Sequence, residues 1–411
     1  MKIYLVGGAI RDQLLGRPVH EKDYVVVGAT VAQMVALGYQ AVGKDFPVFL
    51  HPQTHDEYAL ARTERKTGRG YTQFAFHADP SVTLIDDLRR RDLTINAMAQ
   101  DENGDIIDPY NGQQDLHHKI LRHVSNAFAE DPVRILRVAR FLARYADLGF
   151  TIAPETYSLM RQMVRAGEVN ALVAERVWQE FSLALMEPQP QQFFHVLRKC
   201  GALAILFPQI DQLFGIPDDP LIHSEIDCGE HALLALTRAA NLNFNGAIRF
   251  AALLQNLGKN QTTHSNWPIH PHYQEIGVKQ IQSLCNAYKV SQEYRDLAIL
   301  TIRFHQAVYS ALQLDDEALL TLLEKTDAFR REERFHQFLS ACQVNYCKGL
   351  KESNLTFIQK EFLSSLLIAV NKIDMSLLKS LNLQGKEFGH ALRIERLKKV
   401  DEYLQQANIH K

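Results

Sequence analysis

Glu21 and Asp23 are the first residues of this sequence whose types and spacing could do chemistry, and they stand directly before the apolar run YVVVG. On an extended strand, residues two apart point to the same face, so the two carboxylates would stand roughly 6–7 Å apart. Such a pair suits two divalent metal ions about 3.5–4 Å apart when a third carboxylate helps. The alternative is an exposed acidic edge, and the apolar run favours the metal site because it would bury the strand.

A glycine pair precedes these acids in the stretch LVGGAIRDQLLG, residues 5–16. We expect a strand that turns at Gly7 and Gly8 into a helix. Such a turn lets backbone N–H groups approach a phosphate, and the helix dipole favours the anion. Arg11 would lie one turn into the helix, where a guanidinium can bind phosphate oxygens in a bidentate way. A plain strand-to-helix turn with a solvated Arg11 is the alternative.

A basic helix is predicted over AEDPVRILRVARF, residues 129–141. Asp131 is a good N-cap and Pro132 suits the first helical position. The three arginines that follow, Arg134, Arg137 and Arg140, recur every third residue and so drift slowly round one side of the helix. The alternative is a capped amphipathic helix with a solvated basic face.

The elements that must position these residues change in kind along the chain. Residues 1 to about 125 mix short β-rich runs with a helical segment at 29–39, and Gly, Pro, Asn or His interrupt them. From about residue 125 onward, nearly everything has helical periodicity. We therefore predict an α+β head with a small mixed β-sheet, followed by an all-α region.

Composition narrows the class of protein. The chain has 411 residues, of which 46% are hydrophobic and 22% charged, and its formal net charge is −2. These values are typical of a globular protein, and the length suffices for two to four domains. The five cysteines form no CxxC pair, so we expect no disulfides and a reducing cytoplasm. We expect no signal peptide and no membrane span, because no long apolar run is present.

Six motifs in order over residues 7–181 resemble those of the class II tRNA nucleotidyltransferases, the CCA-adding enzymes, within the polymerase β-like superfamily. They are GGAIRD followed by the acid-x-Asp pair, EYALARTERK (57–66), LRRRDLTINAMA (88–99), DPYNG (108–112), EDPVRILRVARF (130–141) and ERVWQEF (175–181). The resemblance is nearest to the gamma-proteobacterial type. One departure is Glu21, since the family usually has Asp-x-Asp; glutamate is still a hard oxygen ligand.

The resemblance implies an enzyme that adds C, C and A to the 3′ end of tRNA from CTP and ATP, with Mg²⁺ as cofactor. The tRNA 3′ end and acceptor region, ATP and CTP would be its partners. The catalytic residues implied are Glu21, Asp23 and Glu57, of which Glu21 and Asp23 would hold metal. The nucleotide-binding residues implied are Gly8, Arg11, Arg91, Asp131, Arg134, Arg137 and Arg140.

Within this set, Asp131 and Arg134 would read the incoming base. Cytosine and adenine each present an amino donor beside a ring-nitrogen acceptor, and a carboxylate with a guanidinium complements both. Guanine and uracil present the reverse order, so a buried donor or acceptor would stay unpaired, which discriminates up to roughly 10⁴-fold. We expect one Asp–Arg pair to select C and A without a nucleic-acid template.

We divide the chain into a nucleotidyltransferase head (1–140), a helical neck and body (141–222), an HD-like helical domain (223–328) and a helical tail (329–411). The third part resembles the HD phosphohydrolases, and His231 fits their first histidine. Gln255 and Asn256 stand where that family has its His-Asp doublet. Neutral amides are poor substitutes for these ligands, so we expect a degenerate domain without hydrolase activity. The other histidines, His223, His270, His272 and His305, fit surface or packing roles.

Competing interpretations stay open at this point. A poly(A) polymerase, or an enzyme that adds only A or only CC, would share the motifs of the head. A non-catalytic tRNA-binding protein with a degenerate head is a rival from another class, against which Arg11, Asp23 and the RRD motif argue.

Overall fold

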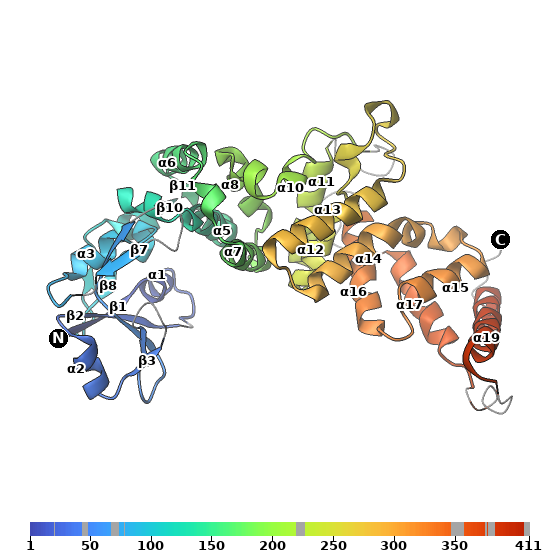
Figure 1. Ribbon diagram of the computed structural model, residues 1–411, viewed down its shortest axis with the longest axis horizontal. Helices are drawn as coiled ribbons and strands as arrows, with labels where there is room; N and C mark the ends of the chain where they lie inside the picture. The colour runs from blue at the N-terminus through green and yellow to red at the C-terminus, as the bar shows by residue number, and fades with distance from the viewer. Residues whose placement is uncertain are drawn as a thin grey trace. The chain divides into compact units, whose positions relative to one another are not determined.

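The computed structural model describes residues 1–19, 21–42, 48–66, 74–77, 79–218, 227–346, 357–374, 376 and 383–406. His223 and Cys347, about which the sequence made predictions, lie outside these ranges. The chain forms two compact units, Met1–Leu206 and Phe207–Lys411, whose elements are labelled in Figure 1. The finer division into four domains stays a prediction.

A seven-stranded mixed sheet organises the first unit, with the order β3-β4-β5-β2-β1-β8-β9. The pair β2–β5 is parallel, and the other pairs are antiparallel. Two small sheets, β6-β7 and β10-β11, stand apart from it. The strands are β1 (Lys2–Val6), β2 (Asp23–Val27), β3 (Gln40–Val42), β4 (Val48–Leu50), β5 (Glu57–Leu60), β6 (Thr63–Lys66), β7 (Phe74–His77), β8 (Ala99–Gln100), β9 (Ile106–Ile107), β10 (Ile120–Leu121) and β11 (Thr151–Ile152).

Alternation along β2 builds a hydrophobic core on each face of this sheet. Val25 packs in a cluster with Leu88 of helix α3, whereas Val26 packs in another with Met34 of helix α2. Both helices begin at a threonine capping box, Thr30 for α2 and Thr83 for α3, in which the threonine and the N3 side chain satisfy two backbone N–H groups. The predicted mixed sheet with helices is confirmed.

The helices of the first unit lie both within its sheet-containing part and after it, and the strands in the later part are short. They are α1 (Gly8–Leu14), α2 (Val31–Ala36), α3 (Leu84–Arg89), α4 (Gly112–His118), α5 (Val133–Tyr145), α6 (Pro154–Arg165), α7 (Ala174–Met186), α8 (Gln191–Cys200) and α9 (Ala202–Leu206). Helix α5 is buried on nearly every side and packs against α7 and α8. Its arginines therefore do not form the solvated basic face that a surface helix would have.

The second unit is helical, as the periodicity after residue 125 predicted. Its described helices are α10 (Pro208–Asp211), α11 (Cys228–Asn241), α12 (Gly246–Leu254), α13 (Tyr273–Tyr288), α14 (Gln292–Tyr309), α15 (Asp316–Lys325), α16 (Glu332–Tyr346), α17 (Ile358–Val370) and α19 (Gly385–Gln406). The apolar α12 packs against α11, α14 and α16 (Figure 1). Within the described residues, no helix combines the length and the hydropathy that crossing a membrane requires. The four described cysteines, Cys200, Cys228, Cys285 and Cys342, are free and buried.

Candidate active site

Three strand ends meet at one end of the sheet and bring the predicted acids together. Asp23, the first residue of β2, pairs with Val6 at the end of β1, so the glycine turn follows directly beside it. On its other side, Asp23 is in register with Glu57, the first residue of β5. Register partners on neighbouring strands project from the same face. Asp23 and Glu57 therefore lie side by side at the end of the sheet.

Glu21 differs from its predicted setting, since β2 begins only at Asp23. Glu21 is thus in the extended lead-in to the strand rather than on the strand itself. It still lines the same cavity as Asp23. Loss of solvation raises the pKa of the Asp23 carboxyl; the Arg91 charge opposes this shift, and the neighbouring Glu21 carboxylate adds to it.

Gly7 makes the turn between β1 and α1 as predicted, with a left-handed φ of 74°. A Cβ placed at this position would come within 2.9 Å of the Arg91 Nη1 atom. Glycine is therefore required twice here, once by the backbone conformation and once by the close approach of an arginine. Helix α1 begins at the next residue, Gly8.

Arg11 is 4% exposed and is held by neighbours on two elements. Its Nε and Nη2 donate to both carboxylate oxygens of Asp12, at 2.9 and 2.8 Å, and its Nη1 donates to Asn96 Oδ1 at 2.7 Å. Asn96 in turn donates through Nδ2 to Asp92 Oδ1 at 3.1 Å. The RRD-x-T-x-NA motif thereby fixes the arginine of the GGAIRD motif.

Arg137 and Arg140 of α5 are tied to carboxylates from other elements. Arg137 Nε donates to Asp92 Oδ2 at 2.7 Å, and Arg140 Nε donates to Glu180 Oε2 of α7 at 2.6 Å. Burial raises the pKa of Asp92, but the Arg137 charge and hydrogen bonds from Asn96 and Arg137 outweigh it, so the net shift is well downward. The carboxylate of Asp92 is therefore ionised and orients Arg137 toward the cavity wall.

Asp131 and Arg134 lie at the start of α5, which begins at Val133, one residue later than predicted. Asp131 Oδ1 accepts a hydrogen bond from the Val133 N–H at 3.2 Å, as a cap does. Arg176 of α7 donates to both oxygens of Asp131, at 3.0 and 2.7 Å. Arg134 donates through Nη1 and Nη2 to two backbone carbonyls, those of Ala127 and Arg90, at 2.6 and 2.7 Å.

These side chains line one cavity of about 920 Å³. Among the described residues, its wall carries nine arginines and four carboxylates (Glu21, Asp23, Asp92 and Asp131), and four further carboxylates, Asp12, Asp87, Glu180 and Glu187, pair with these arginines from outside the wall. A cavity of this volume is of the size that holds a small-molecule ligand, and the guanidinium groups suit a polyanion such as a triphosphate. Nine of the ten predicted site residues line it, namely Gly8, Arg11, Glu21, Asp23, Arg91, Asp131, Arg134, Arg137 and Arg140.

Glu57 is the predicted residue that is absent from this wall, although it stands beside Asp23 in the sheet. Within the described residues, no group of three His, Cys, Asp or Glu side chains is placed to hold a metal ion. The acids present are hard oxygen donors. Mg²⁺ commonly uses one or two such carboxylates and completes its shell with water and substrate phosphates, and the Glu21–Asp23 pair fits that mode.

Other residues of the cavity wall were not among the predicted site residues. Arg176 and Gln179 belong to the ERVWQEF motif, so that motif was the available signal. Phe141 ends the EDPVRILRVARF motif and also lines the cavity. An apolar residue in a helical pattern is indistinguishable from ordinary core packing, so no sequence feature could have singled out Phe141.

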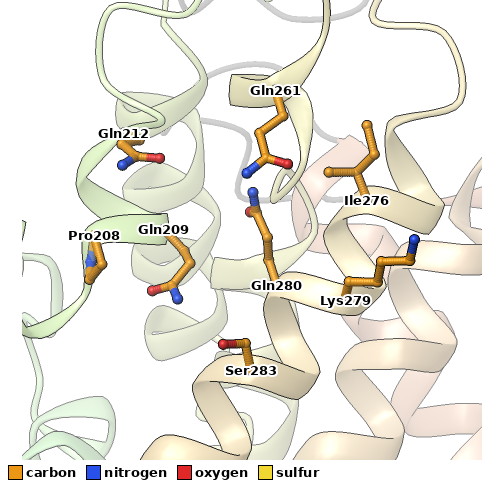
Figure 2. Close-up of a pocket in the computed structure, with 8 residues that line it drawn as sticks. All are labelled: Pro208, Gln209, Gln212, Gln261, Ile276, Lys279, Gln280 and Ser283. Carbon is orange, nitrogen blue, oxygen red and sulfur yellow. The ribbon is translucent and has the colours of Figure 1, made fainter.

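The second unit holds a different cavity of about 460 Å³, which Figure 2 shows. It contains none of the predicted site residues. Its wall carries Gln209, Gln212, Gln261 and Gln280 together with Lys279 and has no carboxylate. Hydrogen bonds from Gln280 to Asn260 and from Asn260 to Gln212, at 3.1 and 2.8 Å, order one side of it.

Gln255 and Asn256, which replace the expected His-Asp doublet, are buried in the second unit. Gln255 donates to Tyr309 Oη at 2.6 Å. Nearby, Lys259 donates to Asp218 Oδ1 at 2.8 Å, and Tyr273 Oη lies 2.8 Å from His305 Nε2. Among the described residues of this cluster, Gln255 Oε1 and Asn256 Nδ2 are buried without a hydrogen-bond partner. The HD-like fold of this unit and its lack of hydrolase activity both stay predictions.

Comparison with known proteins shows which protein family this chain is similar to. Residues 3–122 match the family model of the poly A polymerase head domain, and residues 149–214 match that of a probable RNA and SrmB-binding site of polymerase A. The chain is 54% identical to a multifunctional CCA protein from Thioalkalivibrio sulfidiphilus, over 97% of this chain and 98% of that protein. It is 51% identical to a multifunctional CCA protein from Pseudomonas fluorescens, over 99% of both.

The chain belongs to the multifunctional CCA protein family.

Solved structures agree with this at the level of the fold. A CCA-adding enzyme in complex with ATP superimposes with a TM-score of 0.65 at 20% identity, over 99% of this chain and 89% of that one. A Thermotoga maritima CCA-adding enzyme complexed with tRNA gives 0.61 at 21% identity, over 99% and 91%. The predicted family and fold class are confirmed.

Proposed function

We propose that this protein adds C, C and A to the 3′ end of tRNA from CTP and ATP and releases pyrophosphate. The observation that carries the proposal is the single cavity that holds an acid pair, a glycine turn, and an Asp–Arg pair among nine arginines. Relatives at about half identity over full length are named CCA proteins, which supports the same reaction.

The arginines of the cavity would bind the triphosphate. Arg11 and Arg91 approach the glycine turn, and Arg137 and Arg140 extend from α5. Guanidinium groups match phosphate oxygens in geometry and charge. Because the reaction leaves pyrophosphate, such groups would also stabilise charge on the departing oxygens.

Asp131 and Arg134 would select the base. Their positions are held by Arg176 and by two backbone carbonyls respectively. A carboxylate and a guanidinium fixed in this way complement the amino group and ring nitrogen of cytosine or adenine. A base with the reverse order would leave buried groups unpaired, which is the strongest basis for rejection.

The acids would hold Mg²⁺. Glu21 and Asp23 are the ligands proposed; Glu57 stands beside Asp23 in the sheet but does not line the cavity. When bound, the metal would lower the pKa of the tRNA 3′ hydroxyl and stabilise the departing pyrophosphate. Four free, buried cysteines and a tRNA substrate support the proposal that the protein acts in the cytoplasm.

The test is extension without a template. A tRNA transcript that lacks its last three nucleotides is incubated with the protein, Mg²⁺, and CTP and ATP, with GTP and UTP as controls, and the products are sequenced. Addition of C, C and A followed by a stop is expected. No addition to a tRNA that the protein binds tightly would contradict the proposal and favour a non-catalytic binding protein.

The second candidate is a related nucleotide-adding activity, either poly(A) synthesis or partial addition to tRNA. The match to a poly A polymerase head domain favours it. In the same assay, a long A tail would indicate a poly(A) polymerase, and CC or A alone a partial enzyme. Either product would retain the proposed roles of the acids and arginines and change only the account of how addition stops.

A further inference from the structure

Phe141 occupies an unusual position in the cavity wall, because three guanidinium groups lie over its ring. The Cζ atoms of Arg140, Arg11 and Arg137 are 5.1, 5.4 and 5.5 Å from the ring centroid. The ring is 4% exposed. These three arginines are among those proposed above to hold the triphosphate, so they converge on one apolar side chain.

The ring belongs to a two-ring support built by α5. Phe141 and Tyr145 are one helical turn apart, so their side chains are neighbours. Their planes are nearly parallel, 3° apart, and their centroids are 6.3 Å apart. Arg11 Cζ is 5.4 Å from both ring centroids. Arg11 comes from α1, so this support joins the glycine-turn helix to the helix that carries Arg137 and Arg140.

An aromatic ring holds a cation differently from a carboxylate. A carboxylate occupies N–H donors of the guanidinium, for which a triphosphate must then compete; Asp12, Asp92 and Glu180 do so here for Arg11, Arg137 and Arg140. The face of a ring attracts the cation through its quadrupole, uses no N–H donor, and leaves the positive charge in place. Three of the five N–H groups of Arg11 donate to Asp12 and Asn96, and two remain for a phosphate.

We propose that Phe141 is a positioning residue that gathers Arg11, Arg137 and Arg140 at the triphosphate end of the cavity. This proposal rests on the proposed function for its kinetic readout only. Since the triphosphate is common to both nucleotides, loss of the ring weakens CTP and ATP by the same factor. Base choice stays unchanged, because other partners hold the base-reading pair: Arg176 holds Asp131, and two backbone carbonyls hold Arg134.

The experiment replaces Phe141 by Leu and measures KM and kcat for CTP and ATP, together with binding of inorganic tripolyphosphate by calorimetry. Removal of three cation–ring contacts is expected to raise both KM values and the tripolyphosphate Kd about ten-fold or more. KM is expected to change more than kcat, and misincorporation of GTP and UTP is expected to stay at the wild-type level.

Phe150→Leu is the matched control. Phe150 is also buried, and its ring packs against Tyr145 with centroids 5.3 Å apart. In the described part of the chain, no cation is found over it. This variant is expected to lose a similar amount of stability and to keep wild-type nucleotide KM values. Equal KM values in both variants would overturn the proposal and leave Phe141 as a packing residue.

A second variant covers the case in which Phe141→Leu does not fold. Pentafluorophenylalanine at position 141 has nearly the same shape as phenylalanine and a quadrupole of reversed sign. Weaker tripolyphosphate binding would support the proposal, and unchanged binding would overturn it. If the wild-type protein extends no RNA, the proposed function fails, whereas the tripolyphosphate titrations still decide the role of Phe141.

Discussion

Arg176 holds the carboxylate of Asp131 with two hydrogen bonds, at 3.0 and 2.7 Å, from a helix 45 residues further along the chain. The residue proposed to read the base is therefore oriented by a second element. The start of helix α5 alone restrains one oxygen of this carboxylate, through the Val133 N–H. The fork of the guanidinium fixes both of its oxygens.

Replacement of Arg176 by Ala is expected to relax nucleotide choice. Asp131 then loses the partner that orients it, and kcat/KM for CTP and ATP should fall by about ten- to a hundred-fold. The ratio of CTP to UTP incorporation should fall as well. Arg176→Lys keeps the charge but loses the fork, and it should resemble Ala. Selectivity equal to the wild type in both variants would contradict this account.

Asp23→Asn is expected to abolish addition, because an amide binds Mg²⁺ more weakly than a carboxylate does. We expect kcat to fall at least about a thousand-fold, while the Kd for tRNA, measured by filter binding, changes less than about two-fold. Glu102→Gln, on an exposed turn of the same unit, is the control for a lost negative charge. Substantial turnover by Asp23→Asn would refute the metal role.

Gly7→Ala separates backbone strain from crowding of the site. Both Gly7 and Gly38 have a left-handed φ, 74° and 87°, but a Cβ meets Arg91 only at Gly7, and nothing within 4 Å at Gly38. Each alanine variant should cost about 1 kcal/mol of stability through the backbone alone. We expect only Gly7→Ala to raise the KM for CTP and ATP, since it displaces Arg91. Equal kinetics in the two variants would show that Arg91 tolerates the shift.

Acid is expected to destabilise the second unit through His305. Burial, together with the positive charge of Lys259, lowers the pKa of His305 to about 4, against about 6.5 in the unfolded chain. Between these values, the unfolded state binds the proton that the folded state excludes, so stability falls as the pH falls. The linkage relation gives a loss of about 2 kcal/mol between pH 7 and pH 5.

Urea unfolding at the two pH values checks this expectation. The chain has two tryptophans, so Trp178→Phe leaves Trp267 as a fluorescent probe within the second unit. His305→Gln in the same background should remove most of the pH-dependent loss. A loss that persists unchanged in this variant would assign the acid sensitivity to other groups.

Much of the architecture followed from local patterns. The continuous apolar run after Asp23 predicted β2, the glycine pair predicted the turn into α1, and the helical spacing after residue 125 predicted the all-α region. The start of α5 differed by one residue, and Glu21 fell outside the strand. Such boundaries depend on which backbone groups find partners across the sheet, so a chain segment viewed alone does not fix them.

The sequence by itself determined the family, the fold class and the chemical types present at the site: an acid pair, a glycine turn, and arginines at helical spacing. Each of these is written in residues close together in the chain. Tertiary structure alone decided the partnerships, such as Asp23 beside Glu57, Arg176 on Asp131, and three arginines over Phe141. Those pairs are far apart in sequence, and packing of whole elements against one another selects them. The free energy of this packing is a property of the assembled core, and no local sequence pattern encodes it.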